Sequence, residues 1–144
     1  MLMPDVHVLV HAHRQDAEQH VVALEWLDSV ANGDALFALS AAVATGFFRV
    51  VTSPAVFGTP SRSGEALDFI DELLAAESCR WVSPGPEHWK IFSRLCPSTR
   101  VTGKLAADAV HAATAIEHGC TLASVDGDFA RFEKSGLRRL VLDW

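Results

Sequence analysis

The sequence predicts a single α/β domain, residues 1–144, with three α/β/α layers and a short parallel sheet between helices. Short apolar segments alternate with helical segments of about a dozen residues, a pattern typical of parallel sheets covered on both faces. No internal repeat, charged block or linker divides the chain. Its 144 residues suit one hydrophobic core.

The expected strands are short apolar runs, and the segments between elements are rich in Pro, Gly, Ser and Thr. In chain order the strands are Leu2–Val10, Ala35–Leu39, Cys79–Val82, Cys120–Val125 and Leu137–Leu142. The expected connections are Thr52–Gly64, Ser83–Pro86 and Pro97–Gly103.

The expected helices have apolar residues on one face and local signals at their ends. Gly33 and Gly119 follow two of them as stops, and Ser40 is a suitable N-cap for another. Pro86 occupies a first-turn position, and the helix after it is expected to bury Trp89. The helices are Ala17–Asn32, Ser40–Val50, Gly64–Glu77, Pro86–Cys96 and Gly103–His118.

Composition excludes several classes of protein. Twelve Lys and Arg against 18 Asp and Glu give a net charge of −6, which disfavours non-specific coating of nucleic acid. The three cysteines form no CxxC pair, which disfavours a disulfide scaffold or zinc finger and suits a reducing cytoplasm. The chain has no apolar run of membrane-spanning length and no basic region at its start, so we expect neither a membrane segment nor a secretory signal.

Carboxylates follow the expected strands where open α/β sheets place their working groups. Asp5 follows the first apolar residues of the chain, and Asp126 and Asp128 follow the expected strand Cys120–Val125. Asp108 lies among small apolar residues of an alanine-rich helix. Taken singly, the first three also suit caps or turns, and Asp108 also suits a water-facing position or a pair with Lys104.

Several carboxylates in one pocket repel one another unless they share a proton or a cation. Oxygen-only ligands suit Mg²⁺ or Mn²⁺. Such an ion lowers the pKa of a bound water and neutralises charge on a phosphodiester under attack.

The chain resembles a PIN domain and, more narrowly, a VapC toxin of a type II toxin–antitoxin pair. The resembling segments occur in the family's order over nearly the whole chain. They are Met3-Pro4-Asp5-Val6-His7-Val8-Leu9, Leu39-Ser40 with Gly46-Phe47-Phe48-Arg49-Val50-Val51-Thr52, Asp108-Ala109, and Val125-Asp126-Gly127-Asp128-Phe129-Ala130-Arg131-Phe132.

The resemblance implies a Mg²⁺- or Mn²⁺-dependent endoribonuclease that forms a homodimer and is blocked by a cognate VapB-like antitoxin. It assigns catalysis and metal binding to Asp5, Asp108 and Asp126, with Asp128 as an accessory ligand. It also ends the first strand at Asp5 and makes Val6–Ala12 a helix, whereas apolar periodicity alone extends the strand.

Two positions depart from the family pattern. His7 stands where the family usually has an Asn that orients the first carboxylate, a role that imidazole can also fill. The resemblance also implies a Glu just after Ser40, and Ala41 stands there. The alternative function is therefore an impaired PIN-like module that binds antitoxin or RNA without cutting.

Basic residues near the acids are candidate RNA contacts, because acidic groups alone repel phosphates. The candidates are Arg14, Arg49, Arg100, Lys104 and Arg131, and we expect Arg14, Lys104 and Arg131 above all to make these contacts. For each of them the alternative is a solvated surface charge or a pair with a nearby acid. His111 lies one helical turn beyond Asp108 and faces the same side of that helix. A further alternative is a zinc or nickel site formed by four N-terminal histidines, His7, His11, His13 and His20.

Overall fold

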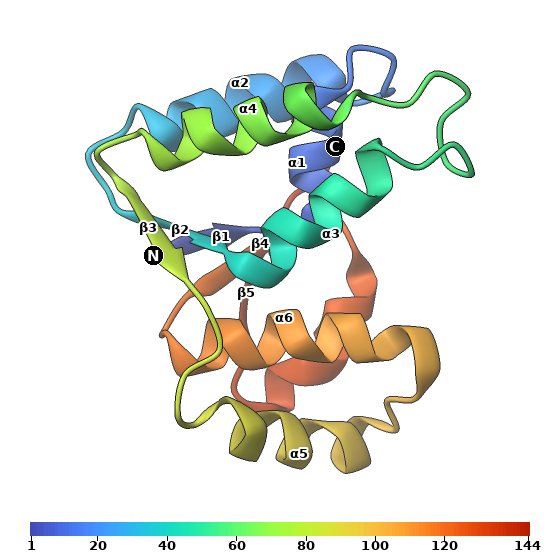
Figure 1. Ribbon diagram of the computed structural model, residues 1–144. Coiled ribbons are helices and arrows are strands. Elements are labelled where there is room, and N and C mark those ends of the chain that lie inside the picture. The colour runs from blue at the N-terminus through green and yellow to red at the C-terminus, as the bar shows by residue number, and fades with distance from the viewer.

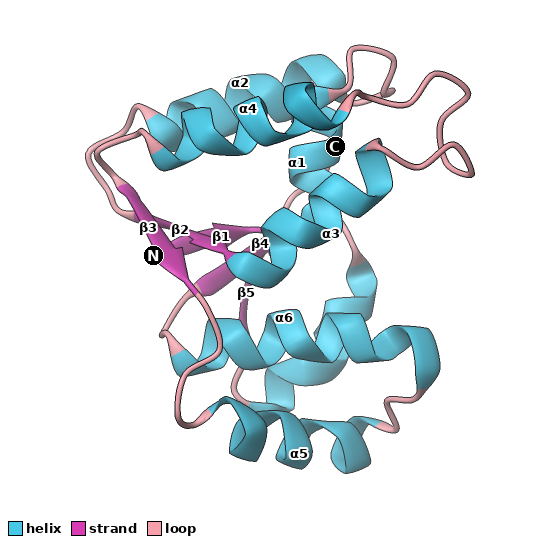
Figure 2. Cartoon of the chain, viewed as in Figure 1, coloured by secondary structure: helices cyan, strands magenta, loops and turns pink.

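A computed structural model describes residues 1–144 and contains one five-stranded, wholly parallel sheet. The spatial order is β3-β2-β1-β4-β5. Figure 2 shows the strands between two groups of helices. The strands are β1 (Leu2–Pro4), β2 (Phe37–Ser40), β3 (Cys79–Val82), β4 (Thr121–Ser124) and β5 (Arg138–Val141). The α/β/α fold predicted from the sequence is confirmed.

Helices cover both faces of the sheet. In Figure 1, α1 to α4 lie above it, and α5, α6 and the 3₁₀ helix η2 lie below. Successive side chains of β2 point to opposite faces of the sheet, so Leu39 packs in the upper core and Ala38 in the lower one. The bounds are α1 (Val6–His13), α2 (His20–Ala31), α3 (Ala41–Val51), α4 (Ser63–Leu74), α5 (His88–Thr99), η1 (Gly103–Leu105), α6 (Ala106–Glu117) and η2 (Gly127–Ser135).

The first strand is much shorter than apolar periodicity predicts, and the Leu2–Val10 strand is wrong. The strand ends at Pro4, and Asp5 caps α1 by accepting a hydrogen bond from the Val6 N–H. The periodicity misleads because α1 is buried on several sides, so consecutive residues such as Val8 and Leu9 are both inaccessible. The helix implied by the family resemblance is confirmed, with its end at His13.

The lower layer corrects two more expectations. Helix α5 continues through Pro97 to Thr99, so the connection expected from Pro97 is shorter. Pro97 lies in the last turn, and the helix ends at Arg100 with a left-handed φ of 57°. The Trp89 side chain is 74% exposed rather than buried, because the inner face of α5 is formed by Leu95.

A carboxylate from α6 fixes the N-terminus of α5. The Glu117 oxygens accept hydrogen bonds from the Gly85 N–H at 2.8 Å and the Glu87 N–H at 2.9 Å. Burial acts to raise the pKa of Glu117, but these hydrogen bonds and the nearby imidazoles of His88 and His118 hold it below its ordinary value. The contact thus joins the N-terminus of α5 to the C-terminal end of α6.

No helix combines the length and apolarity that crossing a bilayer requires.

Candidate active site

The candidate site lies at the carboxyl edge of the sheet, beside the central strand β1 and its neighbour β4. Asp5 follows β1, and Asp126 lies two residues beyond β4. The chain leaves β1 toward β2 on one side, while β4 pairs with β1 on the other, so this is the point where the strand order reverses. Helix α6 brings Asp108 to the same pocket from the lower layer.

Asp5 is held rigidly at the base of the pocket. Its side chain is 5% exposed, and its two oxygens accept hydrogen bonds from the Val6 N–H at 2.6 Å and the Ser124 hydroxyl at 2.7 Å. The Ser124 oxygen in turn accepts a hydrogen bond from the Asp126 N–H at 3.0 Å. Sequence reasoning missed Ser124, although a hydroxyl at the end of an otherwise apolar buried strand signals a polar partner.

Three other carboxylates form a tight cluster at the mouth of the pocket. Asp108, Asp126 and Asp128 each offer an oxygen within 4.8 Å of the others. Asp126 also caps η2 by accepting a hydrogen bond from the Asp128 N–H at 2.8 Å. Burial, followed by the negative charges of Asp126, Asp5 and Asp128, raises the pKa of Asp108 to about 6. A carboxyl group with this pKa is partly protonated near neutral pH, as mutual repulsion requires.

Two histidines lie beside these acids. The Nδ1 atom of His7 is 4.0 Å from a carboxylate oxygen of Asp5, and the His7 ring is 56% exposed. His111 is 7% exposed and lines the pocket with Asp5 and Asp108. Its Nδ1 atom is shielded from solvent and has no hydrogen-bond partner.

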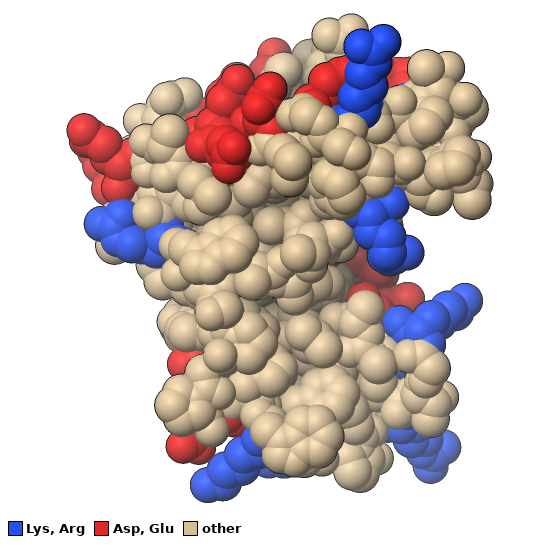
Figure 3. All heavy atoms as spheres, viewed as in Figure 1, with Lys and Arg blue, Asp and Glu red and all other residues tan.

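Basic side chains surround the acids. Arg49 from α3 and Lys104 from η1 line the same pocket, and both are exposed. On the right-hand side in Figure 3, the surface is notched between the upper and lower layers. Acidic atoms lie at the base of this notch, and basic side chains project above and below it. Arg131 is also exposed and donates a hydrogen bond to the Asp128 carbonyl.

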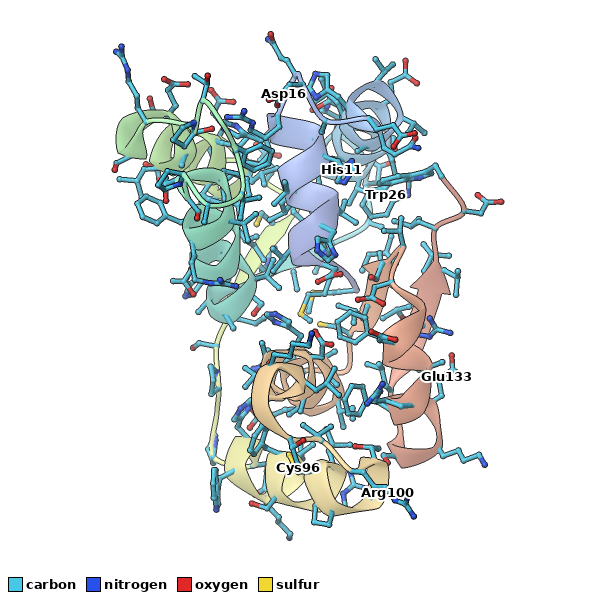
Figure 4. All side chains as sticks on the ribbon, turned by 90° about the vertical axis from the view of Figure 1, so that its right-hand side faces the viewer. His11, Asp16, Trp26, Cys96, Arg100 and Glu133 are labelled. Carbon is cyan, nitrogen blue, oxygen red and sulfur yellow. The ribbon has the colours of Figure 1, made fainter.

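Arg14 lies outside this pocket. Its guanidinium forms a bidentate pair with Asp16, donates to the Thr59 carbonyl and the Ser61 hydroxyl, and stacks on Phe57. Figure 4 shows Asp16 beyond the far end of α1. Because Arg14 is engaged in this separate polar pocket, it is not available to hold a phosphate at the acidic site.

The start of α3 provides no carboxylate. The Ser40 hydroxyl accepts a hydrogen bond from the Val43 N–H, and Ala41 is the first helical residue. Arg49 is the only charged side chain of α3, so no acid elsewhere on this helix replaces the one expected at Ala41.

The residues of the pocket fit a divalent cation. The clustered carboxylates and the raised pKa of Asp108 indicate repulsion between negative charges, which a bound cation relieves. The oxygen donors suit Mg²⁺ or Mn²⁺. The alternative zinc or nickel site is not formed, because the only His, Cys, Asp and Glu side chains close enough together are the three aspartates. His13 instead bonds Ser61, and His20 bonds the His11 carbonyl.

Known proteins match the chain over nearly its whole length. The PIN domain family matches residues 2–135. VapC ribonuclease Mb2897 of Mycobacterium bovis is 40% identical over 134 residues, covering 93% of this chain and 91% of the relative. Ribonuclease VapC25 of Mycobacterium tuberculosis is 36% identical and covers 92% of this chain and 93% of the relative.

The fold is also found among solved structures. VapBC2 from Rickettsia felis, bound to a promoter DNA fragment, aligns with a TM-score of 0.67 at 16% identity, covering 99% of this chain and 98% of that one. The likeness at this identity concerns the fold alone. From the family match and the two relatives, the chain belongs to the PIN domain family and, within it, to the VapC ribonucleases.

Proposed function

We propose that the protein is a metal-dependent endoribonuclease and the toxin of a VapBC-type pair. One observation carries the proposal: four aspartates from three distant segments line or adjoin one pocket at the strand-order reversal. Asp5, Asp108 and Asp126 are the proposed catalytic and metal-binding residues, with Asp128 as a further ligand. The proposed cofactor is Mg²⁺ or Mn²⁺.

Two of the acids, Asp5 and Asp108, have distinct parts in the proposed chemistry. The bound cation supplies charge neutralisation at the phosphodiester and activation of water. Asp5 presents a carboxylate whose orientation is fixed by Val6 and Ser124. Asp108 is partly protonated near neutral pH and releases its proton when positive charge approaches, because repulsion from the other acids then falls. The His7 Nδ1 atom lies 4.0 Å from an Asp5 oxygen, too far for a hydrogen bond, so Val6 and Ser124 alone orient this carboxylate through hydrogen bonds.

The proposed RNA contacts are Lys104, Arg131 and Arg49. Lys104 and Arg49 line the acidic pocket, and Arg131 extends from η2 beside Asp128. Their positive charges offset the repulsion between the aspartates and the phosphates of RNA. Arg14 is omitted because its guanidinium is neutralised by Asp16.

The proposed partners are a VapB-like antitoxin and a second copy of the chain. Membership of the VapC family supports the antitoxin, and the name VapBC2 denotes such a pair in the Rickettsia felis structure. A cytoplasmic location follows from the proposed RNA substrate. Sedimentation at micromolar concentration tests the dimer, which a single monomeric species would exclude.

A binding module without nuclease activity is the second candidate function. The absence of any carboxylate on α3 favours it, because fewer negative ligands bind Mg²⁺ more weakly. Such a protein would still bind antitoxin or RNA through the same surface.

RNA cleavage distinguishes the two candidates. The native chain, Asp5→Asn and Ala41→Glu are compared on RNA with Mg²⁺, Mn²⁺ or EDTA, with Asp68→Asn on exposed α4 as a matched control. A nuclease requires metal-dependent cleavage by the native chain or by Ala41→Glu, its loss in Asp5→Asn, and its retention in Asp68→Asn. If neither the native chain nor Ala41→Glu cuts RNA with either ion, the nuclease proposal fails.

A further inference from the structure

Trp89 is the most exposed large apolar side chain of the protein, and neighbouring rings hold its indole in place. It is 74% exposed, near the start of α5. Its ring stacks on Phe92 with centroids 5.7 Å apart and planes 26° apart, and Phe92 in turn stacks on His88. Stacking restricts the Trp89 ring, and its exposed surface remains open to solvent. The indole is therefore a preformed aromatic surface that no part of the chain covers.

The segment that contains Trp89 concentrates positive charge. From His88 to Ala107 the chain has four basic residues and no acidic one, although the protein carries a net charge of −6. All four are exposed, and none forms an ion pair within the chain. They are Lys90, Arg94, Arg100 and Lys104. By contrast, α4 in the upper layer has four acidic residues and no basic one. Unpaired positive charges beside an open aromatic ring suit a polyanion that carries flat rings.

This basic segment connects Trp89 to the acidic pocket. Helices α5 and α6 pack together and run in opposite directions, since Glu117 at the C-terminal end of α6 binds the backbone at the start of α5. The C-terminus of α5 therefore lies at the same end as Asp108, on the right in Figure 1, where the notch of Figure 3 opens. Lys104 lines the pocket itself. The helix between Trp89 and Arg100 spans about 17 Å, the length of about five stacked nucleotides.

We propose that α5 binds the single-stranded RNA on one side of the scissile bond, with phosphates beside Arg94 and Lys90 and an unpaired base stacked on Trp89. Arg100 and Lys104 continue the path of the phosphates to the acidic pocket. The inference rests on the proposed nuclease function and specifies the form of its substrate. Proteins hold single strands by these two interactions, stacking on aromatic rings and phosphate contacts with Lys and Arg. The paired bases of a duplex are inaccessible to such a ring, so α5 favours unpaired RNA.

Fluorescence anisotropy in EDTA measures RNA binding by the full chain without cleavage. The probe is a labelled oligoadenylate of about 12 nucleotides, compared with the same strand paired to oligouridylate. Trp89→Ala should weaken binding of the single strand at least about fivefold, and Trp89→Phe, which keeps an aromatic ring, should lose less. Trp81→Ala on β3 is the matched control, because this indole is also exposed, at 51%. The three variants should bind the duplex as the native chain does, and thermal melting checks that they fold.

Salt dependence tests the role of the charges. Each phosphate contact contributes about 0.7 to the slope of log affinity against log salt concentration for a single strand. Lys90→Gln combined with Arg94→Gln should therefore make the slope shallower by about 1.4. The matched control is Arg62→Gln combined with Arg80→Gln, two exposed cations outside the basic segment, and it should retain the native slope.

The outcomes separate this inference from the proposed function. Native affinity in Trp89→Ala, an equal loss in Trp81→Ala, or no binding by a native chain that still cuts RNA with metal overturns the role of α5 and leaves the nuclease intact. If Trp89→Ala keeps its RNA affinity and changes from dimer to monomer in sedimentation, α5 contacts a second copy of the chain instead, and the inference fails. A native chain that neither binds nor cuts RNA overturns both proposals.

Discussion

Replacing Asp108 by Asn should stabilise the metal-free protein at neutral pH and remove its response to metal. The native structure raises the pKa of Asp108 from 3.8 to about 6, first through burial and then through three neighbouring carboxylates. The folded state therefore holds this proton more tightly than the unfolded chain. Ionising Asp108 above pH 6 acts against folding, and Asn avoids that ionisation while keeping a similar shape.

The size of the effect follows from the two pKa values. One pH unit corresponds to about 1.4 kcal/mol, so the difference between 3.8 and about 6 gives an upper limit of about 3 kcal/mol. Below pH 3.8 both states are protonated and the substitution has no electrostatic effect. The stabilisation grows as pH rises between the two values and stays constant above the higher one. It reaches at most about 1 kcal/mol near pH 4.5 and at most about 3 kcal/mol near pH 7.5, because solvent screening of the partly exposed Asp108 carboxyl lowers both values.

Urea unfolding of both proteins in EDTA at several pH values measures this difference, with Asp68→Asn on the exposed face of α4 as control. Adding Mn²⁺ at about a hundred times its dissociation constant should then stabilise the native chain by about 2.7 kcal/mol and Asp108→Asn by much less. If Asp108→Asn is no more stable than the native chain near pH 7.5, or gains equally from Mn²⁺, the acids do not repel one another in a shared site.

Three further predictions concern other parts of the molecule. Ala41→Glu adds a carboxylate at the start of α3 and should raise Mg²⁺ affinity in calorimetry by about tenfold, or about 1.4 kcal/mol; unchanged affinity would place this position outside the site. Phe129→Ala removes a core side chain that is 1% exposed, and unfolding should show a loss of about 3 to 5 kcal/mol, whereas a loss under 1 kcal/mol would contradict its packing. Glu117→Ala removes the hydrogen bonds to Gly85 and Glu87 and should lower the unfolding free energy by about 1 to 2 kcal/mol at neutral pH. Because the pKa of this carboxylate is lowered, the difference should persist above its ordinary value of 4.5 and shrink as pH falls through the lowered pKa; a difference that grows in acid would refute the assignment.

The sequence predicts most of the fold because strands and helices of this chain carry clear local signals. Ser40 caps α3 and Gly119 follows α6 as expected, and both signals act within a few residues. The failures occur where apolar residues do not follow the burial that their spacing predicts. Helix α1 is enclosed on several sides and reads as a strand, and α5 exposes Trp89 although that residue is apolar.

The site is predictable only in part for a related reason. Asp5, Asp108 and Asp126 are separated by up to 121 residues, so their spacing does not predict that they share one site. The family resemblance makes that prediction. The hydroxyl of Ser124 matters only once β1 and β4 are known to be neighbours. Arg14 carries the same charge as Lys104, and only the fold shows that Asp16 neutralises it.

Anomalous diffraction from a crystal of the native chain grown with Mn²⁺ tests most directly whether these aspartates bind a cation. We expect a peak at the manganese edge within coordination distance, about 2.0 to 2.6 Å, of carboxylate oxygens of Asp108 and Asp126. A well-ordered crystal with no peak in that pocket, or with peaks only at other surface groups, would contradict the metal centre.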